Sequence, residues 1–214
     1  TDLTISVNEP DVMERDAAYA VAQGYDTLKI KVGESPELDI ARLRAVRRAA
    51  PDAVVRLDAN QAWTPRQAVR ILEQTQSEGL NIELVEQPVK AHDIDGLQFV
   101  TVNSPVPVMA DESVFSPADA FAIMQRHAAD YINIKLMKCG GLSNALKIVS
   151  AAEVYGVECM LGCMLEAKVS VTAAVHLACA KRAITRIDLD GPALCSADPV
   201  TGGAVFNGRH ISVT

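Results

Sequence analysis

The stretch VVRLDAN (residues 54–60) is a short hydrophobic run that ends at Asp58 and passes into a polar loop. Similar runs lie on both sides of it: TLKIKVG (27–33) ends near Lys31, IELVEQP (82–88) near Glu86, VPVMADES (106–113) near Asp111 and YINIKLMK (131–138) near Lys135. These charged residues follow one another at intervals of 27, 28, 25 and 24 residues. Each interval has room for a strand, a helix and two short loops. Charged groups repeated in this way would meet at one rim of a parallel barrel.

Strand-like and helix-like segments alternate along the whole chain. The expected strands are 3–7, 28–32, 53–58, 81–86, 106–110, 131–135, 157–161 and 184–189, and the expected helices are 11–23, 36–49, 65–77, 93–101, 117–127, 142–155 and 167–181. Three of the helices begin with a capping Ser or Thr followed by Pro. The pattern predicts an α/β fold, a (β/α)7β TIM-like barrel over residues 1–202, with a β-like tail (203–214) that turns at Asn207-Gly208. A doubly wound sheet is the alternative, but it gathers active groups at one switch point.

Composition and charge exclude several classes of protein. The chain has 214 residues, which suits one large domain or an incomplete α/β-barrel protein. Its net charge is −7 and it has no Lys/Arg-rich run, which argues against nucleic-acid binding. No apolar stretch reaches the roughly 18 residues of a membrane span, and no signal peptide is expected from the sequence. The five cysteines lack metal-binding spacing and are expected to be free thiols in a reducing, cytoplasmic compartment.

The three carboxylates Asp58, Glu86 and Asp111 predict a metal site. On adjacent strands of a parallel barrel their side chains would be neighbours at the active face. Three oxygen ligands with a combined charge of −3 suit a hard divalent cation, most simply Mg²⁺. The competing interpretation is three ordinary surface acids beside loops, which does not explain why they recur in three consecutive units.

Lys31 and Lys135 lie on strands that flank the three carboxylate-bearing strands, so they are expected on opposite sides of the barrel mouth. Burial and a nearby cation should lower the pKa of such a lysine toward the working range of a base. Two opposed bases can remove a proton from one face of a carbon and return it to the other. Lys29 shares the alternating strand of Lys31, so we expect it to point the same way and to depress the pKa of Lys31 further. Solvated rim lysines, or a salt-bridge role for Lys29, are the plainer alternatives.

The segments LKIKVG, RLDANQAW, LVEQP, MADES, INIKLMKCGGL and GCMLEAKVSVTAAVHLA resemble the enolase superfamily. Within it they are most similar to the dipeptide epimerases of the muconate-lactonizing subgroup, and the resemblance covers essentially the whole chain. It implies Mg²⁺ bound by Asp58, Glu86 and Asp111, and Lys31 and Lys135 as the acid/base pair that abstracts a proton α to a carboxylate through a metal-stabilised ene-diolate.

The substrate is suggested by Asp188 and Asp190 in ITRIDLDGP. Residues two apart on a strand project to the same side, and two carboxylates there suit an ammonium group such as the amino terminus of a dipeptide. Epimerases of the family carry Asp-x-Asp at the corresponding place. Barrel-interior acids held by an Arg or by Lys168 are the alternative. The resemblance also suggests that Cys163 and Met164, after the seventh strand, line the substrate pocket.

Other residues carry weaker signals. Asn60 is a candidate for orienting a ligand or a water molecule, and Glu112 is expected to contact Lys135 or nearby backbone. Gly140-Gly141 could admit an anion at a helix start, although a tight turn is an equally good interpretation. Cys163 as a nucleophile is disfavoured because no His has a spacing that suggests a partner.

Several alternatives remain open at this stage. N-acylamino acid racemases, o-succinylbenzoate synthases and cycloisomerases share the expected fold. A Schiff-base aldolase would use a rim lysine but leaves the three aligned carboxylates unexplained. Relatives carry an N-terminal α+β capping domain, and residues 1–214 are expected to lack one. An inactive truncated barrel, open to water, is therefore a further alternative. A homo-oligomer is also compatible with the sequence.

Overall fold

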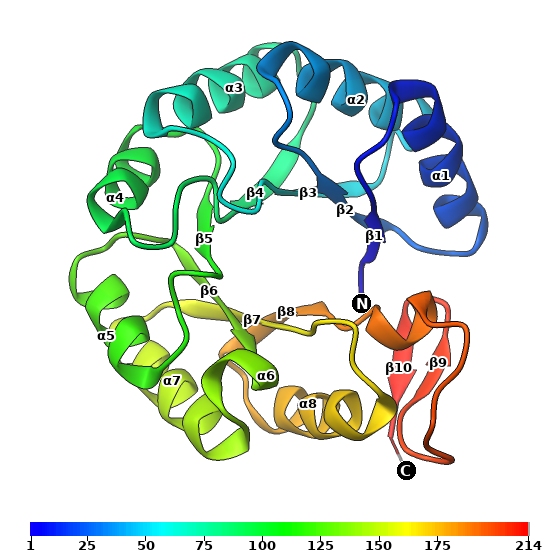
Figure 1. Ribbon diagram of the computed structural model, residues 1–214, viewed down its shortest axis with the longest axis vertical. Coiled ribbons are helices and arrows are strands. Elements are labelled where there is room, and N and C mark those ends of the chain that lie inside the picture. Colours follow the sequence, from blue (N-terminus) through cyan, green and yellow to red (C-terminus); the bar gives the residue numbers. More distant parts are fainter. Residues whose placement is uncertain (214) are drawn as a thin grey trace.

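The structure, a computed structural model, describes residues 1–213, and Thr214, the end of the expected tail, lies outside the described residues. Eight strands form one sheet in chain order, and every neighbouring pair is parallel. The strands are β1 (Leu3–Ile5), β2 (Thr27–Lys31), β3 (Val54–Asp58), β4 (Ile82–Glu86), β5 (Val108–Ala110), β6 (Tyr131–Lys135), β7 (Glu158–Gly162) and β8 (Ile184–Asp188). Figure 1 shows them as the inner ring of a barrel, which confirms the predicted fold.

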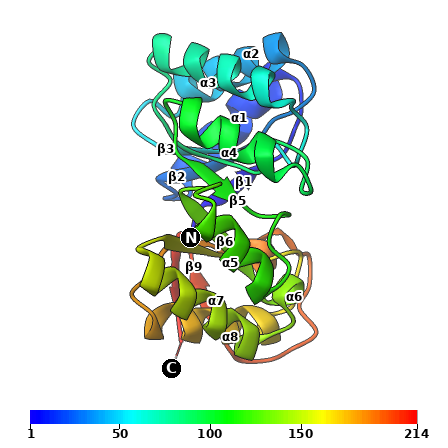
Figure 2. The same ribbon diagram turned by 90° about the vertical axis from the view of Figure 1, so that its left-hand side faces the viewer.

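The helices form an outer ring around the sheet, as Figures 1 and 2 show. They are α1 (Pro10–Ala22), α2 (Pro36–Ala49), α3 (Pro65–Ser77), α4 (Ile94–Asn103), α5 (Pro117–Gln125), α6 (Leu136–Cys139), α7 (Leu142–Tyr155) and α8 (Lys168–Ala180). After β8 come a 3-10 turn (Gly191–Leu194) and the hairpin β9 (Val205–Asn207) and β10 (His210–Ser212). None of the helices within residues 1–213 is both long and apolar enough to cross a bilayer.

Local chemistry explains where three of the helices begin and where one of them ends. Ser35, Thr64 and Ser116 each accept a hydrogen bond from a backbone N–H of the first turn, and proline follows each of them, as the sequence predicts. The predicted end of α5 at 127 is wrong. The helix stops at Gln125 because His127 adopts a left-handed φ of 50° that a helix cannot continue through.

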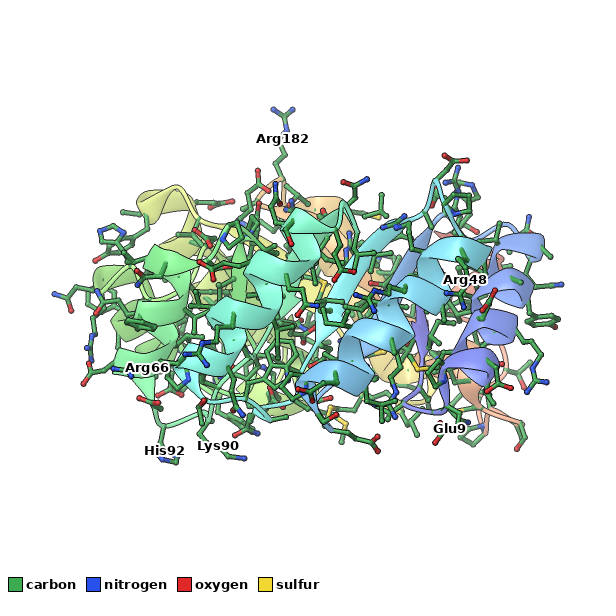
Figure 3. All side chains as sticks on the ribbon, turned by 90° about the horizontal axis from the view of Figure 1, so that it is seen from above. Glu9, Arg48, Arg66, Lys90, His92 and Arg182 are labelled. Atoms are coloured by element: carbon green, nitrogen blue, oxygen red, sulfur yellow. The ribbon has the colours of Figure 1, made fainter. Side chains whose placement is uncertain are left out.

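Alternation along the strands separates the core from the site. In β2, Leu28 and Ile30 are fully buried in the hydrophobic core, whereas Lys29 and Lys31 take the other face of the strand. The inward face therefore carries charged groups into the barrel. The strand ends and following loops share one face: Figure 3 shows Glu9, Lys90 and His92, which follow β1 and β4, opposite Arg182, which precedes β8.

The seam between β8 and β1 is held differently from the other strand pairs. The Asp2 N–H donates to the Ile187 carbonyl at 3.4 Å, and the Thr4 N–H donates to the Asp190 carboxylate at 2.8 Å. A side chain thus replaces part of the strand ladder at this point. The consequence is that Asp190 is fixed beside the barrel mouth although it lies beyond the end of its strand.

Candidate functional site

A cavity of about 440 Å³ opens at the face where the strands end. Strand register brings the charged ends together, because Lys31 is level with Asp58, and Asp58 with Glu86. The cavity contains every expected catalytic and substrate-binding residue and one of the expected metal ligands. It is lined by Thr4, Lys29, Lys31, Asn60, Asp111, Glu112, Phe115, Lys135, Met137, Lys138, Cys163, Met164, Leu165, Asp188, Asp190, Gly191 and Leu194.

The three carboxylates are deeply buried and are paired with lysines. Asp58, Glu86 and Asp111 are 0%, 1% and 2% exposed. Lys31 Nζ lies 2.7 Å from an Asp58 oxygen, and Lys135 Nζ lies 2.8 Å from an Asp111 oxygen and 3.8 Å from a Glu86 oxygen. The two lysines therefore sit on opposite sides of the carboxylate group, each on a different acid.

Lys29 occupies the centre of this arrangement. Its ammonium lies 2.7 Å from Glu86, 2.7 Å from Asp188 and 3.1 Å from Asp58, and its side chain is 3% exposed. Burial disfavours its charge, but the three carboxylates outweigh burial and raise the pKa of Lys29 well above its usual range. Lys29 is therefore a fixed cation that joins the carboxylates, which is the salt-bridge role that the sequence left open as the alternative.

The acids differ in how well their charge is compensated. Burial, with Asp58 nearby, raises the pKa of Glu86 to about 8. Burial acts on Asp58 and Asp111 too, but Lys29 and Lys31 hold the pKa of Asp58 below its usual value, and Lys138 and Lys135 do the same for Asp111. At Glu86 the charges of Lys29 and Lys135 offset burial and the neighbouring acids only in part.

The pKa of Lys135 moves in the direction opposite to the one expected from the sequence. Burial lowers it, but the carboxylates of Glu86 and Asp111 outweigh burial, and the pKa of Lys135 rises above the usual lysine value. The expectation considered burial and a nearby cation, and it did not include the short distances from Lys135 to Glu86 and Asp111. In this arrangement Lys135 is an ammonium.

The Glu86 carboxyl makes stability dependent on pH when no divalent cation is present. Because its pKa of about 8 exceeds the value of 4.5 for an exposed glutamate, the folded state holds an extra proton between these values. Stability should therefore fall as pH rises from about 5 to 8, with a slope of up to about 1.4 kcal/mol per pH unit. Urea unfolding in EDTA at several pH values measures the slope.

The matched variant for this prediction is Glu86→Gln, which keeps the size of the side chain but cannot ionise. Asp2 and Asp190 also have raised pKa values, mainly through burial, so part of the slope should persist in the variant. The same slope in Glu86→Gln and in the parent protein would contradict the prediction.

Asp188 and Asp190 both line the cavity but have different partners. Asp188 accepts a hydrogen bond from Lys29 at 2.7 Å, so Lys29, rather than an Arg or Lys168, holds it. Asp190 accepts from the Thr4 backbone, and burial together with the charge of Asp188 raises its pKa. Asp190 also lies beyond β8, which ends at Asp188, so the two do not share a strand as the sequence suggested. Two buried acids at one end of the cavity form a candidate site for a cation.

Cys163 and Met164 follow β7 and face the cavity, as the sequence suggested. Burial raises the pKa of Cys163 to about 12, which leaves the thiol protonated. This agrees with the sequence, which argues against Cys163 as a nucleophile. The loop is held close to Gly191: a Cβ on that glycine would lie 2.6 Å from the Met164 carbonyl oxygen. The loop therefore forms a wall of the cavity.

The weaker candidates have clear places in the structure. The Asn60 side-chain oxygen accepts from Lys31 at 2.8 Å, so it contacts a lysine rather than a free ligand position. Glu112 accepts from Asn60 at 3.1 Å, and its expected contact with Lys135 is not among the contacts of residues 1–213. Gly140 and Gly141 have φ values of 83° and 102° and make the tight turn before α7.

Sequence reasoning missed two functional neighbours of the carboxylates. Asn133 donates to Glu86 at 2.7 Å, and Lys138 makes an ion pair with Asp111 and donates to its backbone carbonyl at 2.5 Å. Asn133 could have been found, because it lies two residues before Lys135 on the inward face of the same strand. Lys138 depends on α6, a single turn of four residues that periodicity does not reveal.

The donor set suits a hard divalent cation by its chemistry. It consists of carboxylate oxygens, it is buried, and the lysines near Glu86 only partly offset the effect of burial on its pKa. As the side chains stand, no three His, Cys, Asp or Glu groups in residues 1–213 are arranged to hold a metal ion, because lysines occupy the carboxylates. A cation at Asp58, Glu86 and Asp111 would compete with these ammonium groups for the same oxygens.

Comparison with known proteins places this geometry in a family. The sequence model of the family described as "Enolase C-terminal domain-like" matches residues 12–214. An L-Ala-D/L-Glu epimerase from Clostridium acetobutylicum is 63% identical over 212 residues, which are 99% of this chain and 59% of that protein. The chain thus spans about 60% of the length of the curated relative.

Solved structures agree closely with the fold. The substrate-liganded L-Ala-D/L-Glu epimerase from Bacillus subtilis superimposes with a TM-score of 0.98 at 49% identity, over 100% of this chain and 60% of that one. The dipeptide epimerase from Enterococcus faecalis V583, complexed with Mg and the dipeptide L-Leu-L-Tyr, gives a TM-score of 0.95 at 48% identity, over 99% and 60% of the two chains.

Proposed function

This chain belongs to the family of enolase C-terminal domain-like proteins, and we propose that the intact protein is an isomerase that epimerises dipeptides with Mg²⁺ as cofactor. The observation that carries the proposal is the placement of Lys31 and Lys135 on opposite sides of one buried carboxylate group. The names of relatives that match 99–100% of the chain, all of them dipeptide epimerases in the comparisons above, support the same activity.

Asp58, Glu86 and Asp111 are the residues that would hold Mg²⁺. When bound, the ion supplies positive charge next to the substrate carboxylate, where negative charge develops as the α-proton leaves. Glu86 is the acid whose charge is least compensated, so it gains most from a cation. The lysines now on these oxygens would be freed to face the substrate.

Lys31 and Lys135 would divide the proton transfer between them. One lysine, as the free amine, takes the proton from the α-carbon, and the other, as the ammonium, delivers a proton to the opposite face. One proton is removed and one is added, so the configuration inverts and the composition of the substrate does not change.

Asp188 and Asp190 would bind the amino terminus of the dipeptide. Each is at most 5% exposed, and their mutual repulsion would be relieved by an ammonium between them. Cys163 and Met164 would contact the substrate from the β7 loop, and Lys29 would hold Asp188 in place.

Blocking the substrate amine tests this assignment. An N-acetylated dipeptide should react with a kcat/KM about 100-fold below that of the free dipeptide, because two buried carboxylates lose their cationic partner. Epimerisation of both compounds, followed by NMR, measures the ratio.

Asp190→Asn is the matched control for the blocked substrate. In this variant the two compounds should differ less than in the parent protein, because half of the cation site is gone. Equal rates for both compounds in the parent protein would contradict the assignment and would favour an N-acylamino acid racemase.

We also propose a cytoplasmic location. All five cysteines are free: Cys139 and Cys159 are buried, Cys163 is half-buried, and Cys179 and Cys195 are exposed. Exposed free thiols persist most readily in a reducing compartment.

A further inference from the structure

Lys31 and Lys135 are held in different ways. Lys135 is confined by burial, since its side chain is 8% exposed, whereas that of Lys31 is 27% exposed. Lys31 has an amide partner, a kind that Lys135 lacks in the described chain: its ammonium donates to the Asn60 side-chain oxygen at 2.8 Å as well as to Asp58 at 2.7 Å. A half-exposed lysine on a flexible four-carbon stem needs such a partner to keep one position.

The orientation of the Asn60 amide is fixed by Glu112. The amide nitrogen donates to a Glu112 carboxylate oxygen at 3.1 Å. A carboxylate accepts hydrogen bonds and does not donate them, so the nitrogen must face Glu112 and the oxygen must face Lys31. Glu112 on the loop after β5 therefore determines which atom of Asn60 reaches a lysine on β2.

The backbone of the loop after β3 is shaped to present this side chain. Asn60 and Gln61 both adopt left-handed φ values, 41° and 68°, which are costly for residues other than glycine. The Asn60 N–H donates to Asp58 at 3.0 Å, and the Gln61 N–H donates to the Gln87 carbonyl at 2.8 Å. These backbone contacts hold the loop without the Asn60 side chain, so the side chain can be removed separately.

We propose that Asn60 is a positioning residue for Lys31, with its amide oriented by Glu112. Lys31 therefore depends on a relay of two hydrogen bonds, from Asn60 to Glu112 and from Lys31 to Asn60, which Lys135 does not use. The inference rests on the proposed function, in which each lysine serves one face of the α-carbon. Asn60 acts through Lys31 and needs no contact with the substrate.

Three variants isolate the relay. Asn60→Gly removes the amide and is compatible with the left-handed φ, so it adds no strain. Asn60→Asp keeps an oxygen that can accept from Lys31, but the new carboxylate and that of Glu112 repel each other. The double variant Asn60→Asp/Glu112→Gln restores the pairing, since the new amide donates to the new carboxylate. Gln61→Ala is the matched control: it lies next in the loop, has the same left-handed backbone and bonds Ala91 N–H rather than Lys31.

The first readout is α-proton exchange with D₂O, measured separately for the two diastereomers of a dipeptide with the intact protein and Mg²⁺. Lys31→Ala identifies the diastereomer whose proton Lys31 removes. For that diastereomer, Asn60→Gly should slow exchange about 10- to 100-fold with little change in KM, and the other diastereomer should stay within about threefold. The double variant should recover most of the rate. An equal loss on both faces, as a merely structural role would give, would overturn the proposal.

The second readout does not need turnover. The ammonium signal of Lys31 in a ¹H–¹⁵N correlation spectrum is identified by its loss in Lys31→Ala. This signal should weaken in Asn60→Gly, because the ammonium is less ordered, and should recover in the double variant. The ammonium signal of Lys135 should stay unchanged in these variants, and both ammonium signals should stay unchanged in Gln61→Ala. An unchanged Lys31 signal in Asn60→Gly overturns the proposal. If the parent protein exchanges neither diastereomer, the proposed function fails, and this spectrum still decides whether Asn60 positions Lys31.

Discussion

Replacing Lys135 by alanine should abolish inversion at the substrate α-carbon, with a loss of about 10³-fold or more. In the proposed mechanism Lys135 serves one face of the carbon. Within residues 1–213, Lys29 is bound by three carboxylates, and Lys138 is bound by Asp111 and three backbone carbonyls, so we expect neither to replace it. Exchange of the α-proton from the face of Lys31 should persist. Lys31→Ala should show the mirror image, with exchange from the face of Lys135 alone.

Proton NMR in D₂O distinguishes exchange from inversion, because exchange without inversion removes the α-proton signal and produces no second diastereomer. Lys147→Ala, on the exposed face of α7, is the control and should behave like the parent protein. Full turnover by both Lys31→Ala and Lys135→Ala would rule out the two-base mechanism.

Loss of one carboxylate should remove metal binding. Asp111→Asn keeps the shape of the side chain but takes away one of three charges, and Mg²⁺ affinity should fall by more than about 100-fold, since changes to outer contacts of metal ligands already cost 10- to 100-fold. Isothermal titration calorimetry measures the affinity, and activity should be lost in parallel.

Asp95→Asn provides the control for metal binding, because Asp95 lies at the start of α4 and is 85% exposed. Its Mg²⁺ affinity and activity should match those of the parent protein. Equal affinity in Asp111→Asn and Asp95→Asn would show that the cation binds elsewhere.

The strand-end residues could be predicted from the sequence because the period of the fold fixes them. In a parallel barrel each unit returns the chain to the same face, so Asp58, Glu86 and Asp111 had to meet once the strands were recognised. The cap-and-proline starts gave three helix beginnings for the same reason, since their chemistry is local.

Contacts between distant strands could not be predicted in the same way. Lys29 pairs with Asp188, 159 residues away, and nothing local to either residue selects the other. Asp190 takes its place from the Thr4 N–H across the β8–β1 seam rather than from its own strand. Both contacts depend on how close the end of β8 lies to β1 and β2, which only the three-dimensional structure shows.

The pKa of Lys135 shows where sequence reasoning met its limit. Its direction depends on the balance between desolvation and Coulomb attraction, and both vary steeply with distance. With Glu86 at 3.8 Å and Asp111 at 2.8 Å, the attraction is the larger effect. A list of neighbouring charges without distances could not have decided this balance.

The most direct test of the account is α-proton exchange by the intact protein into L-Ala-L-Glu and a small dipeptide library in D₂O, first with Mg²⁺ and then with EDTA, followed by NMR. The account predicts exchange with inversion that requires Mg²⁺ and stops in EDTA. Exchange that is indifferent to EDTA, or trapping of a lysine by borohydride, would contradict it and favour Schiff-base chemistry.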